Sequence, residues 1–314
     1  MSEVPAVGPA PLTMSAGRTH GAHWQARRSE RLAHICIAPA VILMVITTLA
    51  PVGAVLALSL TDYQLGALSF NWVGLDNFAS ALQDRGAQRA VSNTLLFAAM
   101  VVPVSVGMGL FFALLVVSRT RTRRFYELMI FLPLTTTMAA MAIVWSFVLH
   151  GRIGPVNGLM AAIGLPTIDF FSDPGAVLPS LALIGVWQHM CFCFIVFLAG
   201  LMAIPKDLYE AAALDGADCG WEKFRRITWP LLGPTTLVVV LLTTIRAFQV
   251  FDLVVVLTQG GPAGRSEVIL YEMYLEAFAY FRVGYGSTLA LIFIAMVGTI
   301  SLLQLWYARR RRAA

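Results

Sequence analysis

The sequence predicts an all-α membrane protein with six transmembrane helices. Of its 314 residues, 58% are hydrophobic and 12% are charged, about half the charged share of an ordinary soluble domain. Six apolar segments are each long enough to cross a hydrocarbon core about 30 Å thick. Apolar surface on this scale needs lipid as its solvent, which excludes a soluble protein. The net charge of +5 could suggest nucleic acid as a partner, but the basic residues lie where a membrane protein needs them.

The first 32 residues are polar and end in several arginines, which predicts a flexible cytoplasmic tail. The first apolar segment, 34–60, is too long for the core of a signal peptide and is predicted to span the membrane. The other predicted spans are 90–118, 128–149, 177–202, 231–257 and 287–307. Together the six spans form a predicted membrane domain of residues 33–308. A basic C-terminus, 309–314, follows the last span.

The lysines and arginines orient these spans. Sixteen of the 22 lie in the N-terminal tail, the 119–125 loop, the 203–230 loop and the C-terminus, all of which six crossings place on one face. Five lie in the loops of the other face, and Arg246 lies within a span. Because positively charged loops stay in the cytoplasm, both termini and the 203–230 loop are predicted to be cytoplasmic.

Residues 205–234 form the longest charged passage in the second half of the chain. Pro205 suits the first turn of a helix, and Lys206–Leu214 are good helix formers. Gly216 can adopt the left-handed conformation that ends a helix, and Asp218 can cap a second one. The pattern predicts two helices at the membrane surface that offer a charged face to a partner in the aqueous phase.

This passage resembles the EAA loop of ABC importer permeases. The matching residues are Glu210, Ala211, Ala212, Asp215, Gly216, Ala217, Phe224, Ile227, Pro230 and Pro234. The resemblance implies a type I ABC importer permease fold, in which this cytoplasmic loop is a coupling helix that docks on a separate ATPase. It assigns the contact to Glu210, Ala211, Ala212, Asp215, Gly216 and Ala217. An amphipathic interfacial hairpin, with Glu210 either as a helix cap or paired to Lys206, is the alternative.

The outer loops extend the resemblance to nearly everything from residue 35 onward. The residues that carry it are Phe251, Asp252, Gly260, Gly261, Pro262, Tyr274, Ala277, Phe278, Gly284 and Gly286. They are similar to those of permeases in binding-protein-dependent sugar importers of the maltose and glycerol-3-phosphate type. Where such sequences often have Thr, this one has Ser266, which retains a hydroxyl. The resemblance implies a sugar or polyol as solute, a second non-identical permease, two ATPase subunits and an extracytoplasmic solute-binding protein.

Two polar groups interrupt the apolar segments. In the fifth segment they are Arg246, Gln249 and Asp252, which in a continuous helix with about 100° per residue form one stripe about 120° wide. Charges within a span usually face a water-filled path or a partner helix. The stripe is therefore predicted either to line a translocation path or to contact the companion permease. The fourth segment adds three further path candidates, for which packing is the alternative: Trp187, Gln188 and His189.

Sequence patterns for catalysis and nucleotide binding are missing. A P-loop needs Gly-Lys-Ser/Thr, whereas Lys206 follows proline and Lys223 follows glutamate. The four cysteines have no metal-binding spacing. We therefore expect no enzyme, metal or cofactor in this chain, with ATP and magnesium bound by the partner ATPases. The alternatives are a self-contained secondary transporter or channel, which would need ion-coupling carboxylates, and an ABC permease for a non-carbohydrate solute.

Overall fold

The computed structural model describes residues 36–119, 121–214 and 220–313. Within these ranges the chain is helical, apart from loops and one isolated antiparallel bridge between Thr61 and Trp72. The chain divides into two units, residues 1–54 and 55–314. In the first unit a helix begins at Cys36 and passes through the π-helical turn η1 (Val45–Leu49) into α2 (Ala50–Ser59).

Among the described residues, five helices are long and apolar enough to span a membrane, or six if one bent pair counts as a span. The five are Cys36–Ser59, α4 (Arg85–Val117), α8 (Val177–Met202), Gly233–Leu257 and α15 (Val283–Ala313). The bounds of α8 match the prediction. α15 begins earlier than predicted and continues into the basic C-terminus, where the Arg310 guanidinium stacks on the Trp306 ring at 3.9 Å.

The third predicted span is not one straight helix. It consists of α5 (Arg123–Phe131), the 3-10 turn η2 (Leu132–Thr135) and α6 (Met138–Val148), with a bend of 99°. The Thr135 and Thr136 hydroxyls donate to the carbonyls of Leu132 and Pro133. Such bonds compete with the helical ladder, and a proline and three β-branched threonines in a row favour a break.

The fifth predicted span is also interrupted. It divides into α12 (Gly233–Phe248) and α13 (Asp252–Leu257), and Phe251 between them has an extended φ of −144°. The prediction of a continuous helix from Arg246 to Asp252 is therefore wrong, and so is the regular stripe derived from it. β-Branched and aromatic residues at 250 and 251 lose side-chain freedom in a helix, which favours the break.

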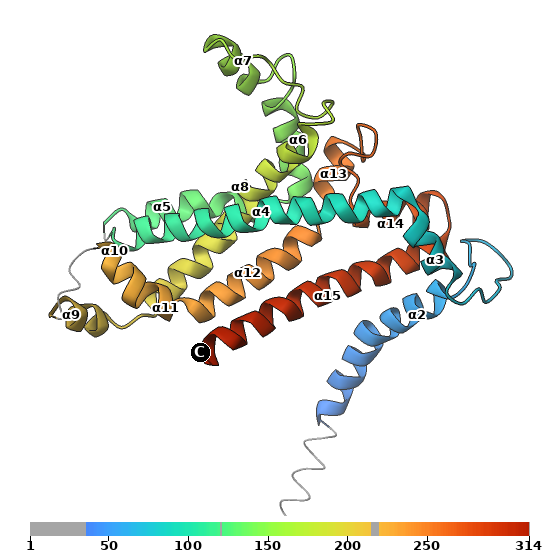
Figure 1. Cartoon of the computed structure of the whole chain (residues 1–314), viewed down its shortest axis with the longest axis horizontal. Helices are drawn as coiled ribbons and strands as arrows, with labels where there is room; N and C mark the ends of the chain where they lie inside the picture. The colour runs from blue at the N-terminus through green and yellow to red at the C-terminus, as the bar shows by residue number, and fades with distance from the viewer. Residues whose placement is uncertain (1–35, 120, 215–219, 314) are drawn as a thin grey trace, which may run out of the picture. The chain divides into compact units, whose positions relative to one another are not determined.

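The core of the second unit forms where α4 packs along α8 and where α12 packs against α4, α8 and α15 (Figure 1). Gly109 of α4 allows a close approach to α8, because a Cβ at this position would lie 2.4 Å from the Cβ of Cys193. Small residues at such contacts are typical of membrane helix pairs. Cys191 and Cys193 are buried there, as expected for packing residues.

The loops at one end of the second unit are held by half-buried amide side chains. They include the short helices α3 (Asp76–Gln83), α7 (Pro155–Ala162), α14 (Ile269–Tyr274) and the π-helical η4 (Leu275–Ala279). Asn77 donates to the carbonyls of Ser59 and Thr61, and Asn93 to those of Gly264 and Glu267. Each amide thus satisfies loop carbonyls that no helix or sheet satisfies.

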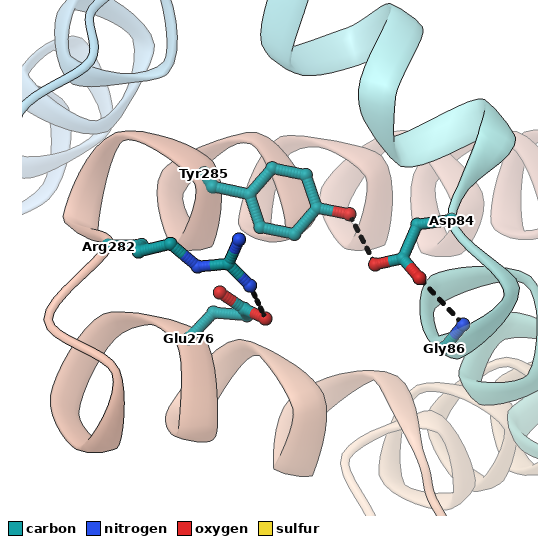
Figure 2. Close-up of polar contacts among 5 residues, drawn as sticks. All are labelled: Asp84, Gly86, Glu276, Arg282 and Tyr285. Atoms are coloured by element: carbon teal, nitrogen blue, oxygen red, sulfur yellow. Dashed lines mark hydrogen bonds and ion pairs between the residues drawn. The ribbon is translucent and has the colours of Figure 1, made fainter.

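A polar cluster closes the same end of the unit. Figure 2 shows Asp84, which accepts a hydrogen bond from the amide of Gly86 at the start of α4 and another from the Tyr285 hydroxyl. Beside it, Arg282 forms an ion pair with the buried Glu276. The cluster therefore joins the beginnings of α4 and α15 to η4.

Candidate functional site

Five of the six polar candidates from the apolar segments line a single cavity of about 270 Å³, although the stripe that grouped three of them is not helical. The five are Gln188, His189, Arg246, Gln249 and Asp252. The two from α8 lie opposite the three from α12, the break and α13. Because the helix ends at Phe248, Gln249 and Asp252 lie at the two ends of a short loop that faces the cavity.

These side chains are free to bind something else. Among the described residues, none of the five forms a hydrogen bond or an ion pair through its side chain. Arg246 stacks on the ring of Phe192, with the guanidinium carbon 4.1 Å from the ring centroid. An unpaired cation and carboxylate in apolar segments are costly unless water or a ligand reaches them. The cavity therefore has the properties of a hydrated binding site.

Trp187, the sixth candidate, does not line this cavity. Its ring packs edge-on against Trp145 of α6, with 5.5 Å between ring centroids. The position of Trp187 therefore agrees with packing, which was the alternative predicted from the sequence. The cavity also has an apolar part that the sequence pattern did not indicate, formed by Phe97, Met138, Gly185 and Phe251. Apolar residues in apolar segments carry no distinguishing pattern, so only the fold could identify them.

The cavity combines hydrogen-bond donors and acceptors with aromatic surface. The guanidinium of Arg246 donates, the carboxylate of Asp252 accepts, and the amides of Gln188 and Gln249 do both. This combination suits an uncharged solute with many hydroxyl groups. No cluster of three or more metal-ligating side chains occurs in the part of the chain that the structure describes. At about 270 Å³ the cavity is near the lower limit for small-molecule sites, about 300–1,000 Å³.

The second candidate region consists of four short helices: α9 (Lys206–Leu214), α10 (Gly220–Lys223), the π-helical η3 (Phe224–Thr228) and α11 (Trp229–Leu231). The predicted first helix has the observed bounds. Glu210 and Ala211 are exposed and Ala212 is half-buried. Glu210 has no ion-pair partner among the described residues, so the predicted alternative of a pair with Lys206 is absent there. The other predicted contact residues lie outside the described ranges: Asp215, Gly216 and Ala217.

A polar contact joins the two sides of this region, which also present apolar surface. The hydroxyls of Tyr209 and Thr228 lie 3.1 Å apart, which connects α9 to η3. The rings of Trp221 and Phe224 stack with 5.6 Å between centroids. Trp221 is nevertheless 68% exposed, and Leu208 of α9 is 44% exposed. Exposed aromatic and aliphatic side chains beside unpaired charges are typical of a protein interface.

Comparisons with known proteins identify the family of the chain. A family model described as the inner membrane component of binding-protein-dependent transport systems matches residues 105–313. The chain is 30% identical over 281 residues to the sn-glycerol-3-phosphate transport system permease protein of Agrobacterium fabrum, covering 89% of this chain and 95% of that protein. It is also 30% identical to the trehalose/maltose transport system permease protein of Thermococcus litoralis, covering 91% of this chain and 96% of that protein.

Solved structures show the same fold. One is the crystal structure of a bacterial ABC transporter involved in the import of the acidic polysaccharide alginate, with a TM-score of 0.78 and 24% identity over 91% of this chain and 98% of that chain. Another is a bacterial alginate ABC transporter in complex with its alginate pentasaccharide-bound periplasmic protein, with a TM-score of 0.79 and 23% identity over 91% of this chain and 97% of that chain.

Proposed function

Because the chain belongs to the family of inner membrane components of binding-protein-dependent transport systems, we propose that it forms half of the translocation path of an ATP-driven importer for a sugar or polyol. It is a multi-pass inner membrane protein. In the proposed importer, a second, non-identical permease supplies the other half of the path. Two cytoplasmic ATPase subunits supply the energy, and an extracytoplasmic binding protein delivers the solute.

The cavity lined by Gln188, His189, Arg246, Gln249 and Asp252 is the observation that carries this proposal. Its polar side chains are unpaired within the described chain, and its volume is small for a complete solute site. Both properties are expected of half a path, since the facing permease would enclose the remainder. Relatives named for glycerol-3-phosphate and for trehalose/maltose transport support a hydroxyl-rich solute.

The region α9–α11 is proposed to couple this path to the ATPases. The distribution of basic residues supports a cytoplasmic position for this region and for both termini. ATP binding would draw the two ATPases together, and α9 would transmit their movement to the membrane helices. Such coupling requires contacts that differ between the two conformations, and the exposed Glu210 would make such a contact in one of them.

Uptake of radiolabelled solutes tests the assignment of the path. The transporter is purified from native membranes, reconstituted in liposomes with its binding protein, and assayed with a panel of sugars and polyols. Asp252→Ala and Gln249→Ala are expected to lower the rate of uptake about ten-fold or more for each hydrogen-bonding group removed. Asp173→Ala changes an exposed carboxylate that does not line the cavity, and uptake should be unchanged.

Two outcomes would contradict the proposal. If Asp252→Ala and Asp173→Ala have equal effects for every solute that is transported, the cavity does not lie on the path. If the chain alone moves solute in liposomes without ATP, it is a secondary transporter or a channel. Uptake of a non-carbohydrate solute would preserve the importer and reject the proposed class of substrate.

A further inference from the structure

A second cavity differs from the polar one because most of its lining is apolar. It is a groove of about 580 Å³ between α5 and α8. Its wall is mainly apolar and includes Leu128, Phe131, Ile195 and Ala199. Its polar lining comes from the first turns of α5: Arg123, Arg124 and Glu127. We propose that this groove binds one anionic phospholipid, with the headgroup on the arginines and an acyl chain along the apolar wall.

The position of the arginines supports a headgroup site at the mouth of the groove. Arg123 is the first residue of α5, and its guanidinium contacts the sulfur of Met202, the last residue of α8. The start of α5 is therefore level with the end of α8, and the arginines lie where the apolar segments meet water. Arg119 and Arg121 lie just before α5 and are exposed. Basic clusters directly beside a membrane span attract anionic lipid headgroups.

The charges in the groove are not balanced by the protein. Glu127 is engaged by Arg123, with 2.6 Å between Oε1 and Nε. Arg124 is exposed and has no hydrogen-bond or ion-pair partner among the described residues. One positive charge thus remains at the mouth of the groove. A phosphate can accept a charge-assisted hydrogen bond from a guanidinium of this kind.

The wall of the groove supplies the second half of a lipid site. Leu128 is 66% exposed and Met202 is 55% exposed, on opposite sides of the groove. An acyl chain lying between them would gain contacts with both helices. A soluble phosphate compound would leave this apolar wall uncovered, and a helix from another protein would have to offer an acidic group at the level of Arg124. Phospholipid satisfies both requirements with one molecule.

Native mass spectrometry of the complex that contains the full-length chain, purified in mild detergent, tests this proposal. Dioleoyl phosphatidylglycerol and dioleoyl phosphatidylcholine are titrated separately, and bound lipid is counted. Phosphatidylglycerol is expected to bind more tightly, and Arg124→Ala should reduce that preference about five-fold, since a basic residue at the membrane surface contributes about that factor. Arg152→Ala removes an exposed arginine that belongs neither to the groove nor to the basic cluster beside it, and it should leave the preference unchanged.

A second pair of variants tests the acyl-chain site separately from the charge. Ala199 is an exposed residue in the wall of the groove, so Ala199→Trp fills the groove without disturbing the core. This variant should lose the tightly bound lipid, whereas Leu183→Trp, an exposed position of the same helix outside the groove, should retain it. Equal binding of both lipids, or equal effects of the paired variants, would overturn the proposal. A photoreactive residue at position 199 that crosslinks to another protein instead of lipid would also overturn it.

Discussion

The two ends of the second unit use their polar side chains in opposite ways. At the end that carries α3, α7 and α14, buried or half-buried amide side chains bind the backbone of neighbouring loops. Asn157, for example, is 2% exposed and forms hydrogen bonds with both the N–H and the carbonyl of Ile168. In α9–α11 the polar side chains are mostly exposed, and Glu210 has no ion-pair partner among the described residues.

This difference separates residues that maintain the fold from residues that are available to a partner. Internal hydrogen bonds hold the loops around α3, α7 and α14 in one geometry, as a docking surface for a binding protein would require. The helices α9–α11 leave charges and large apolar side chains uncovered, which stabilises little by itself. Substitutions at the first end should therefore change stability, and substitutions in α9–α11 should change association with partners.

Asn157→Ala should have the largest effect on stability. The variant leaves the carbonyls of Gly151 and Ile168 and the N–H of Ile168 without their partner. Each unsatisfied buried group costs about 1–3 kcal/mol, so the variant should be destabilised by about 3–5 kcal/mol. Thermal unfolding of the purified protein in detergent measures this loss. Asn71→Ala, which removes an exposed amide paired with Asp62, should change stability little, and equal losses would refute the distinction.

A smaller effect is expected from pH at the same end. Burial and the neighbouring carboxylates of Glu267, Glu276 and Asp84 raise the pKa of Glu272 to about 7, from an ordinary value of 4.5. The carboxyl takes up its proton more readily in the folded protein, so it contributes its full stability below about pH 4.5. That contribution is lost as the pH rises through about 7.

The apparent melting temperature should therefore fall between pH 5 and pH 8, by the equivalent of at most about 3 kcal/mol. Glu272→Gln cannot ionise and should remove this part of the pH dependence. Glu222→Gln, at a half-buried position in α10, is the control and should retain it. A pH profile that Glu272→Gln leaves unchanged would show that the buried carboxylate is not responsible.

The smallest effect is expected in α9–α11. Glu222 forms an exposed ion pair with Arg226, with 2.8 Å between Oε1 and Nη2. Exposed pairs four residues apart contribute about 0.3–0.5 kcal/mol. Glu222→Ala should therefore lower the stability by no more than about 0.5 kcal/mol in thermal unfolding. A loss as large as that of Asn157→Ala would mean that α9–α11 is part of the folding core.

The sequence predicted the helical class and the approximate positions of the five helices that are long and apolar enough to span a membrane among the described residues. Long apolar runs require lipid, and there the backbone must be satisfied within a helix. It also predicted the bounds of α8 and α9. It did not predict the breaks in the third and fifth spans. Those depend on local competition for backbone hydrogen bonds, as at Thr135 and Thr136, which hydropathy does not register.

The polar residues within the apolar segments were sufficient to indicate which side chains line the candidate cavity. Five of six such residues line one cavity, although the helical stripe that grouped three of them is absent. The cluster around Asp84 and Tyr285 was not predicted, because its members are 201 residues apart in the chain. Only the N-cap role of Asp84, just before α4, could have been read from local sequence.

The most direct test of the central claim is the effect of Glu210→Lys on the association with the ATPase. Affinity-purified complexes from native membranes are analysed by mass spectrometry, and the thermal stability of the same chain is measured in parallel. If Glu210 contacts the ATPase, the variant should retain the companion permease and lose the ATPase, and the stability of the chain should change by less than about 0.5 kcal/mol. Asp207→Lys, the same charge change three residues earlier in α9, should retain the ATPase. Retention of the ATPase by Glu210→Lys would contradict the account, and so would a loss that occurs only together with unfolding.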